Sequence, residues 1–126
     1  MKETQVAVIG AGPAGLTAAI EVARAGGRVT VIDERAEYAT PERFPRAHQV
    51  VAGDPIQALG TLPTSADSTY ALVFTHSHKR DIEIVSVLLG HPLRYLGMIG
   101  SRTKWARFRA ALLERGHEPA HRTVHV

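Results

Sequence analysis

The chain of 126 residues contains no cysteine. A disulfide framework, a thiolate metal site and a cysteine nucleophile are therefore excluded. Aromatic residues are few, at 6% of the sequence, and every apolar run is shorter than the roughly 20 residues of a membrane span. The first residues show no signal-peptide pattern. We therefore expect a cytoplasmic protein without a membrane partner.

The formal net charge is a modest +3, but the basic residues are unevenly distributed. From residue 91 onward they outnumber the acidic ones: Arg94, Arg102, Lys104, Arg107, Arg109, Arg115 and Arg122 against Glu114 and Glu118. Either a solvated helix face or a site for a small anion explains this excess. Nucleic acid is not the expected partner, because no aromatic interleaving or known nucleic-acid-binding motif accompanies the charge.

Strand and helix patterns alternate along the chain. Apolar, β-branched segments predict strands at 5–9, 28–33, 49–52, 69–75 and 95–99. Helices are expected at 13–25, 54–62, 82–89 and 101–115, and 123–126 is either an edge strand or disordered. The alternation predicts one α/β, Rossmann-like domain over 1–126, a doubly wound parallel sheet of about five strands in the order 3-2-1-4-5.

A glycine-rich turn, GAGPAG, follows the first predicted strand. Gly10, Gly12 and Gly15 match the dinucleotide-binding pattern G-x-G-x-x-G. In that pattern they allow a tight turn, close approach to a pyrophosphate and close packing of helix on strand. Pro13 suits the first helical position, and the helix N-terminus would then face the phosphates. The alternative is that these glycines serve packing alone.

The second predicted strand ends in an acid, Asp33, roughly 20 residues after the glycine turn, as the dinucleotide pattern requires. Its carboxylate would accept from a ribose hydroxyl, whereas Arg35 would instead meet a 2′-phosphate. NAD, NADP and FAD therefore all stay open. The segment from Val6 to Asp33 resembles the FAD-binding opening of flavoprotein oxidoreductases, and this resemblance ends near residue 35.

The strand predicted at 69–75 runs into the polar segment THSHKRD. We expect Thr75 and His76 to lie beside the glycine turn, where a neutral histidine can bind a phosphate or pterin edge or ligate a metal. The alternative is a polar loop in which Asp81 caps a helix. Metal hydrolysis is disfavoured, because no second Asp-His pair follows, and no metal site is predicted.

A second polar segment follows the strand predicted at 95–99. Gly100 gives clearance there, and Ser101 is a natural helix N-cap. Arg102 and Lys104 lie in the first turn of the predicted helix, where acidic residues would be usual. The two cations therefore indicate an anion site, unless they are ordinary basic surface residues.

Four motifs resemble the Rossmann domain of the XdhC/CoxI family, in consistent order over about 37–117: ATPERFP, GDP, THSHKRD and YLGMIGSRTKWARF. The family comprises accessory proteins of xanthine dehydrogenase and related molybdenum hydroxylases. The resemblance implies binding of the molybdenum cofactor (molybdopterin), support of its sulfuration and its delivery to the apo-enzyme. The family's first turn commonly has the form GAGHVA, and its N-terminal domain and C-terminal extension are not found here. A single-domain relative, a truncated product and a fusion are the open explanations.

The leading hypothesis is a cofactor-handling accessory domain without turnover of its own, so no catalytic residue is predicted. The expected partners are a small-molecule cofactor and a molybdenum hydroxylase apo-enzyme, and the sequence leaves room for a homodimer. An NAD(P)- or FAD-linked oxidoreductase fragment and a ligand-free interaction module are the alternatives. The predicted cofactor-binding residues are Gly10, Gly12, Pro13, Gly15, Asp33, Arg35, Thr75, His76, Gly100, Ser101, Arg102 and Lys104.

Overall fold

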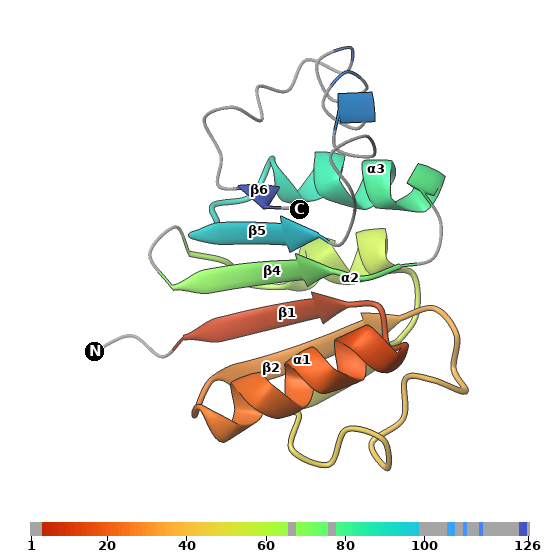
Figure 1. The fold of residues 1–126 in the computed structure, drawn as a ribbon, viewed down its shortest axis with the longest axis vertical. Helices are drawn as coiled ribbons and strands as arrows, with labels where there is room; N and C mark the ends of the chain where they lie inside the picture. Colours follow the sequence, from red (N-terminus) through yellow and green to blue (C-terminus); the bar gives the residue numbers. More distant parts are fainter. Residues whose placement is uncertain are drawn as a thin grey trace.

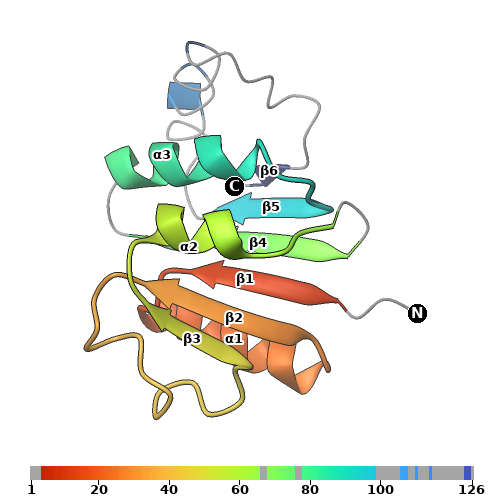
Figure 2. The ribbon, with the colours of Figure 1, turned by 180° about the vertical axis from the view of Figure 1, so that it is seen from behind.

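The computed structural model describes residues 4–65, 68–75 and 78–98, together with 106, 107, 110, 114, 124 and 125. A parallel sheet runs through them in the order β3-β2-β1-β4-β5-β6 (Figure 1; β3 is labelled in Figure 2). Its strands are β1 Gln5–Ile9, β2 Arg28–Asp33, β3 Gln49–Ala52, β4 Thr69–Val73, β5 Tyr95–Met98 and β6 Val124–His125. The predicted α/β class and the order 3-2-1-4-5 are confirmed, and β6 extends the sheet beyond β5 as an edge strand.

Helices cover the two faces of the sheet. Helix α1 (Pro13–Arg24) lies on one face, and α2 (Pro55–Thr61) and α3 (His78–Leu88) lie on the other (Figures 1 and 2). Right-handed crossovers explain this division, because the step from β1 to β2 and the steps from β3 to β4 and β5 run in opposite directions along the sheet. The sheet order therefore reverses between β1 and β4.

The sheet is buried on both faces, and successive strand residues alternate between two apolar clusters. On one face Val6 and Val8 pack with Ala19 of α1. On the other face Ile9 packs with residues of α2 and α3, among them Leu59 and Leu88. Burial on both faces explains why the central strands are almost entirely apolar rather than alternating with polar residues.

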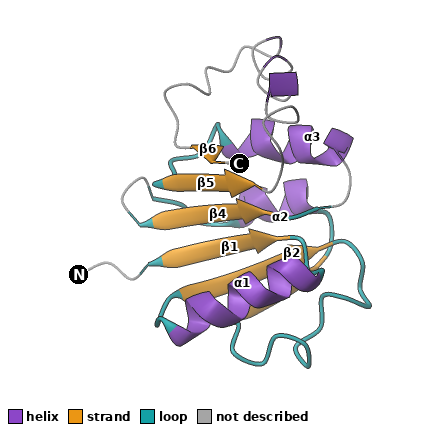
Figure 3. Cartoon of the chain, in the orientation of Figure 1, coloured by secondary structure: helices purple, strands orange, loops and turns teal. Residues whose placement is uncertain are grey.

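The segment between β2 and β3 has neither helix nor strand (Figure 3), and its prolines Pro41 and Pro45 disfavour a continuous helix there. Its Phe44 is buried in the cluster beneath α1. The loop therefore takes the place of a crossover helix on that face and closes part of the core.

The largest differences from the predicted boundaries are at the start of α3 and the end of β4, whereas the bounds of α1 and α2 differ from the prediction by at most one residue at each end. Helix α3 begins at His78 rather than at residue 82, because its first turn is polar and an apolar pattern detects the helix only from Ile82 onward. Strand β4 ends at Val73, two residues early. Of the helix expected over 101–115, the described residues 106, 107, 110 and 114 are helical, and the rest lies outside the described residues. No helix in the described ranges is long and apolar enough to cross a membrane.

Candidate cofactor-binding site

The glycine turn connects the end of β1 to the start of α1. Gly10 has a φ of +115°, and a Cβ there would lie 2.6 Å from the carbonyl oxygen of Phe74. At Gly15 a Cβ would lie 1.8 Å from the carbonyl oxygen of Gly10. Both positions therefore require glycine for the turn and for the packing of α1, with or without a ligand.

The first turn of α1 has no side-chain cap. Gly12 is the N-cap residue in an extended conformation, Pro13 follows it, and no acidic residue lies in the first turn. The N-terminal N–H groups of a helix have no partner within the helix and carry the positive end of its dipole. This arrangement suits a phosphate next to the carboxyl ends of β1 and β2.

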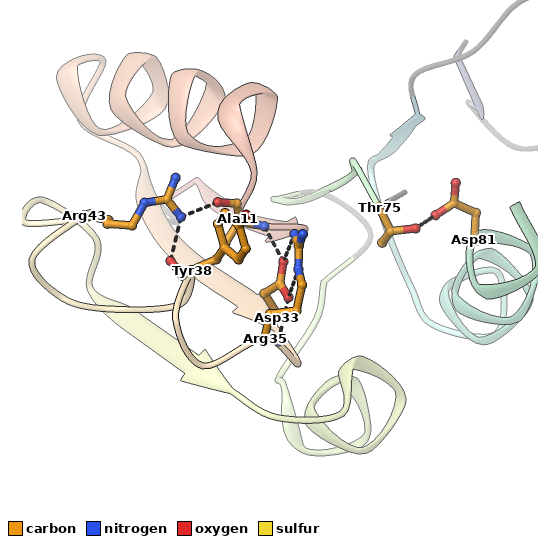
Figure 4. Close-up of polar contacts among 7 residues, drawn as sticks. All are labelled: Ala11, Asp33, Arg35, Tyr38, Arg43, Thr75 and Asp81. Atoms are coloured by element: carbon orange, nitrogen blue, oxygen red, sulfur yellow. Dashed lines mark hydrogen bonds and ion pairs between the residues drawn. The ribbon is translucent and has the colours of Figure 1, made fainter. Parts of the chain in front are cut away.

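Asp33 at the end of β2 is buried, with 5% of its surface exposed. Its Oδ2 accepts hydrogen bonds from the Ala11 N–H at 2.8 Å and from Arg35 Nη2 at 2.8 Å (Figure 4). Its Oδ1 accepts from the backbone N–H of Arg35 at 2.8 Å and from Arg35 Nε at 3.0 Å. Burial alone would raise the pKa of Asp33, but these hydrogen bonds together outweigh it and lower the pKa below its ordinary value.

The ion pair changes the predicted role of the acid. The sequence predicts Asp33 as an acceptor for a ribose hydroxyl, with Arg35 as a separate group. In the structure Arg35 forms an ion pair with the carboxylate of Asp33. Its guanidinium carbon lies 4.2 Å from the centroid of the Tyr38 ring. A ribose at Asp33 would therefore require Arg35 to move.

Arg43 is a residue of this site that the sequence analysis did not single out. Its Nη1 donates to the carbonyl oxygens of Ala11 at 2.5 Å and Tyr38 at 2.8 Å (Figure 4). It ties the loop between β2 and β3 to the glycine turn. No local pattern indicates the contact with Ala11, because the two residues are far apart in the sequence, although Arg43 belongs to the ATPERFP motif.

A cavity of about 280 Å³ opens at the carboxyl ends of β1, β2 and β4. Ligands of open α/β sheets bind at this edge, where the strand order reverses. The cavity brings together four of the predicted residues, Gly10, Asp33, Arg35 and Thr75. The other residues that line it are Ile9, Ile32, Glu34, Pro55 and Arg80.

Arg80 also lines the cavity and was likewise not predicted from the sequence. Its Nη2 lies 2.7 Å from Asp54 Oδ1 and 3.8 Å from Glu34 Oε2, and its Nη1 lies 2.9 Å from Glu83 Oε2. Asp54 also caps α2, since Oδ1 accepts from the N–H of Ile56 at 2.9 Å. Arg80 therefore links the end of β2 and the starts of α2 and α3.

Thr75 and Asp81 meet on the α3 side of the cavity. The Thr75 hydroxyl donates to Asp81 Oδ1, and Asp81 is 2% exposed (Figure 4). Asp81 lies inside the first turn of α3, three residues after the residue at which the helix begins. The alternative that placed it as a cap before the helix is therefore wrong.

The remaining predicted residues, His76, Gly100, Ser101, Arg102 and Lys104, lie outside the described residues. The predicted anion site after β5 therefore stays a prediction. Within the described part of the chain, no group of three or more His, Cys, Asp or Glu residues could hold a metal ion.

The family model of the XdhC Rossmann domain matches residues 6–126 of this chain. The chain belongs to the XdhC family. The match starts before the glycine turn, so the XdhC-like part is longer than the 37–117 inferred from the motifs. The opening that resembles flavoproteins lies within it.

Two relatives of this XdhC domain are larger proteins. A probable xanthine dehydrogenase component from Bacillus subtilis is 33% identical over 114 residues, which cover 90% of this chain and 33% of that protein. The alpha chain of a sarcosine oxidase from Corynebacterium is 33% identical over 100 residues, 79% of this chain and 10% of that one. The XdhC domain therefore spans a third or less of the length of these relatives.

Solved structures agree on the fold. A xanthine dehydrogenase from Bacillus halodurans superposes with a TM-score of 0.77 at 28% identity, over 86% of this chain and 32% of that chain. The NAD(P)-binding domain of an exopolyphosphatase-related protein from Archaeoglobus fulgidus superposes with a TM-score of 0.72 at 19% identity, over 99% of this chain and 87% of that one. At that identity the second likeness concerns the fold alone.

Proposed function

We propose that this XdhC domain binds the molybdenum cofactor (molybdopterin), or a nucleotide form of it, for the maturation of a xanthine dehydrogenase-like molybdenum hydroxylase. The observation that carries the proposal is the cavity at the carboxyl edge of the sheet, bordered by Gly10 of the glycine turn. In this fold that edge is where phosphate-bearing ligands bind.

Residues that line the cavity, and the start of α1 just beyond Gly10, support binding of a phosphorylated ligand; Gly12, Pro13 and Gly15 do not themselves line the cavity. The uncapped first turn of α1 offers N–H groups to a phosphate or pyrophosphate. Arg35, at the end of β2, adds a cation on the neighbouring wall. In the proposed role the domain acts by holding and transferring the cofactor.

Several expectations accompany this proposal. The whole chain, 1–126, acts as one cofactor-binding domain in the cytoplasm. Its macromolecular partner is the apo-form of a molybdenum hydroxylase, to which the domain delivers the cofactor. Homodimerisation stays a prediction, which sedimentation of the purified chain would test.

A second candidate is binding of NAD(P) or FAD, as part of an oxidoreductase. The observation that favours it is the acid at the end of β2 beside the glycine turn, which is the arrangement of dinucleotide-binding domains. Asp33 reaches the turn directly, through its hydrogen bond from Ala11. The two candidates share the phosphate-binding turn and differ in the rest of the ligand.

Titration with molybdenum cofactor, NAD, NADP and FAD separates these candidates. The molybdenum cofactor should bind with micromolar or tighter affinity, and more tightly than the three dinucleotides. Preference for FAD or a nicotinamide dinucleotide would favour the second candidate. Absence of binding by all four would contradict both.

Gly12→Val tests the glycine turn in the same assay. A valine side chain at this buried N-cap should block the approach of a phosphate and weaken binding about tenfold or more. Gly60→Val is the matched control, because a Cβ at Gly60 in α2 meets no atom within 4 Å. Unchanged affinity in Gly12→Val, with both variants folded by circular dichroism, would contradict phosphate binding at the turn.

A further inference from the structure

Asp33, the buried acid of the cavity, has no unused hydrogen-bond acceptor position. Each oxygen of Asp33 accepts two hydrogen bonds, from the Ala11 N–H, the Arg35 N–H and the Arg35 guanidinium. An ionised carboxylate offers about four acceptor positions. A ribose hydroxyl that enters the cavity therefore finds no place on Asp33 while Arg35 keeps its position.

The guanidinium of Arg35 does have unused donors. Two of its side-chain N–H groups bond to Asp33, and its other N–H groups have no hydrogen-bond partner within the described part of the chain. Its side chain is 30% exposed and lines the cavity. Asp33 on one side and the Tyr38 ring on the other hold the group in place, so binding a ligand costs little further side-chain freedom.

The other charged groups of the cavity are engaged elsewhere. Arg80 faces three carboxylates, those of Glu34, Asp54 and Glu83. Glu34, the remaining acid on the cavity wall, lies on the Arg80 side at 3.8 Å from Nη2, and its side chain is mostly exposed to solvent. Arg35, by contrast, forms an ion pair with a single carboxylate among the described residues, that of Asp33, and Glu37 attracts it without an ion pair.

We propose that Arg35 makes this cavity a site for a phosphate monoester rather than for a ribose diol. A phosphate dianion would accept charge-assisted hydrogen bonds from the unused donors while Arg35 keeps its pair with Asp33. The inference rests on the proposed function, since both require a ligand at the carboxyl edge. A monoester of this kind has two sources, the 2′-phosphate of an NADP-type dinucleotide and the terminal phosphate of molybdopterin.

The test uses two pairs of probes whose members differ by one phosphate monoester. One pair is NADP and NAD, measured by isothermal titration calorimetry. The other is the stable fluorescent oxidation product of molybdopterin with and without its phosphate, measured by fluorescence anisotropy. In at least one pair the phosphorylated member should bind about tenfold more tightly or better, and that pair identifies the source. Equal affinities within both pairs would overturn the inference.

Variants assign the effect to Arg35. Arg35→Ala should reduce the advantage of the phosphorylated probe to about twofold or less, and Arg35→Lys should give an intermediate value, because an ammonium keeps the charge but not the fork of donors. Arg28→Ala removes the same charge from the exposed opposite end of β2 and should keep the full advantage. If the advantage survives in Arg35→Ala, or falls equally in Arg28→Ala, the assignment is wrong. Should Arg35→Ala not fold, Arg35→Lys and the wild-type pairs decide.

The same titrations separate failure of the inference from failure of the proposed function. Equal binding of both oxidised pterins, without a preference for NADP over NAD, would overturn the role of Arg35 and leave the proposed cofactor binding in place. Absence of binding by every probe and by the intact molybdenum cofactor would overturn both.

Discussion

Two arginines that line the same cavity, Arg35 and Arg80, differ in their surroundings. Arg35 pairs with one buried carboxylate, Asp33, and stacks on Tyr38. Arg80 is shared by three partly exposed carboxylates from three different segments. Arg80 therefore links the segments that carry these acids, whereas Arg35 presents hydrogen-bond donors to the cavity. The number of acids around an arginine, rather than its place on the cavity wall, separates these roles.

The largest expected effect is a loss of stability at the glycine turn, on which the cavity depends. Gly15→Ala places a Cβ against the carbonyl oxygen of Gly10, at 1.8 Å in the unrelaxed structure. Because the Cβ is rigidly attached to the backbone of α1 and the oxygen belongs to the backbone of the turn, neither can yield without moving α1, and the free energy of unfolding should fall by about 3 kcal/mol or more. Urea unfolding measures the change, with Gly60→Ala as a control at an open position. A loss below about 1 kcal/mol would show that the turn adapts.

The comparison of the two arginines predicts unequal losses of stability. Arg35→Ala leaves a buried carboxylate with backbone donors alone and should cost about 2 kcal/mol. Arg80→Ala should cost about 1 kcal/mol, because its acids are partly exposed and water screens them once it is gone. Urea unfolding of both variants at neutral pH gives the order. A larger loss of stability in Arg80→Ala than in Arg35→Ala would contradict this comparison of the two arginines.

The smallest effect is a pH dependence that comes from Asp33. Its pKa is lowered in the folded protein, so the unfolded chain binds the proton more readily. The stabilisation is therefore complete above the ordinary carboxyl value of about 3.9, and is lost as the pH falls below it through the folded pKa. Urea unfolding between about pH 6 and pH 3 should show a steeper acid loss in the wild type than in Asp33→Asn.

Two features of that experiment make it specific. Glu21→Gln, which removes an exposed carboxylate from α1, controls for the loss of one negative charge. Equal slopes in the wild type and in Asp33→Asn would contradict the stabilising role of the pair. A variant that loses the acid slope but keeps neutral-pH stability would show that backbone donors replace the ion pair.

Much of the fold was predictable because its signals are local. The strands at Gln5–Ile9, Arg28–Asp33 and Gln49–Ala52 were predicted with their observed bounds, since these apolar β-branched runs end at a glycine or a charged residue. The start of α3 was misplaced, because a polar first turn carries no apolar pattern. The glycine turn was recognisable because Gly10 and Gly15 occupy positions where any Cβ would collide with backbone.

The candidate site was predictable only in part. The sequence indicated the residues at the strand ends, and the structure brings Gly10, Asp33, Arg35 and Thr75 to one cavity. The sequence did not indicate Arg43, although its guanidinium donates a hydrogen bond to the carbonyl oxygen of Ala11 in the glycine turn. Contacts of this kind join segments far apart in the chain, and their partners depend on the path of a loop that has no regular structure.

The order of strands and helices, the glycine turn and the resemblance to XdhC follow from the amino-acid sequence, because periodicity, turn residues and motifs are properties of neighbouring positions. Only the tertiary structure shows that Asp33 forms an ion pair with Arg35. It also shows that Arg80 forms ion pairs with three acids, Glu34, Asp54 and Glu83. Several acids and several arginines lie near the strand ends in the sequence. Which of them pair depends on burial and on distances of a few ångströms, and these are set only when the sheet, α2 and α3 pack together.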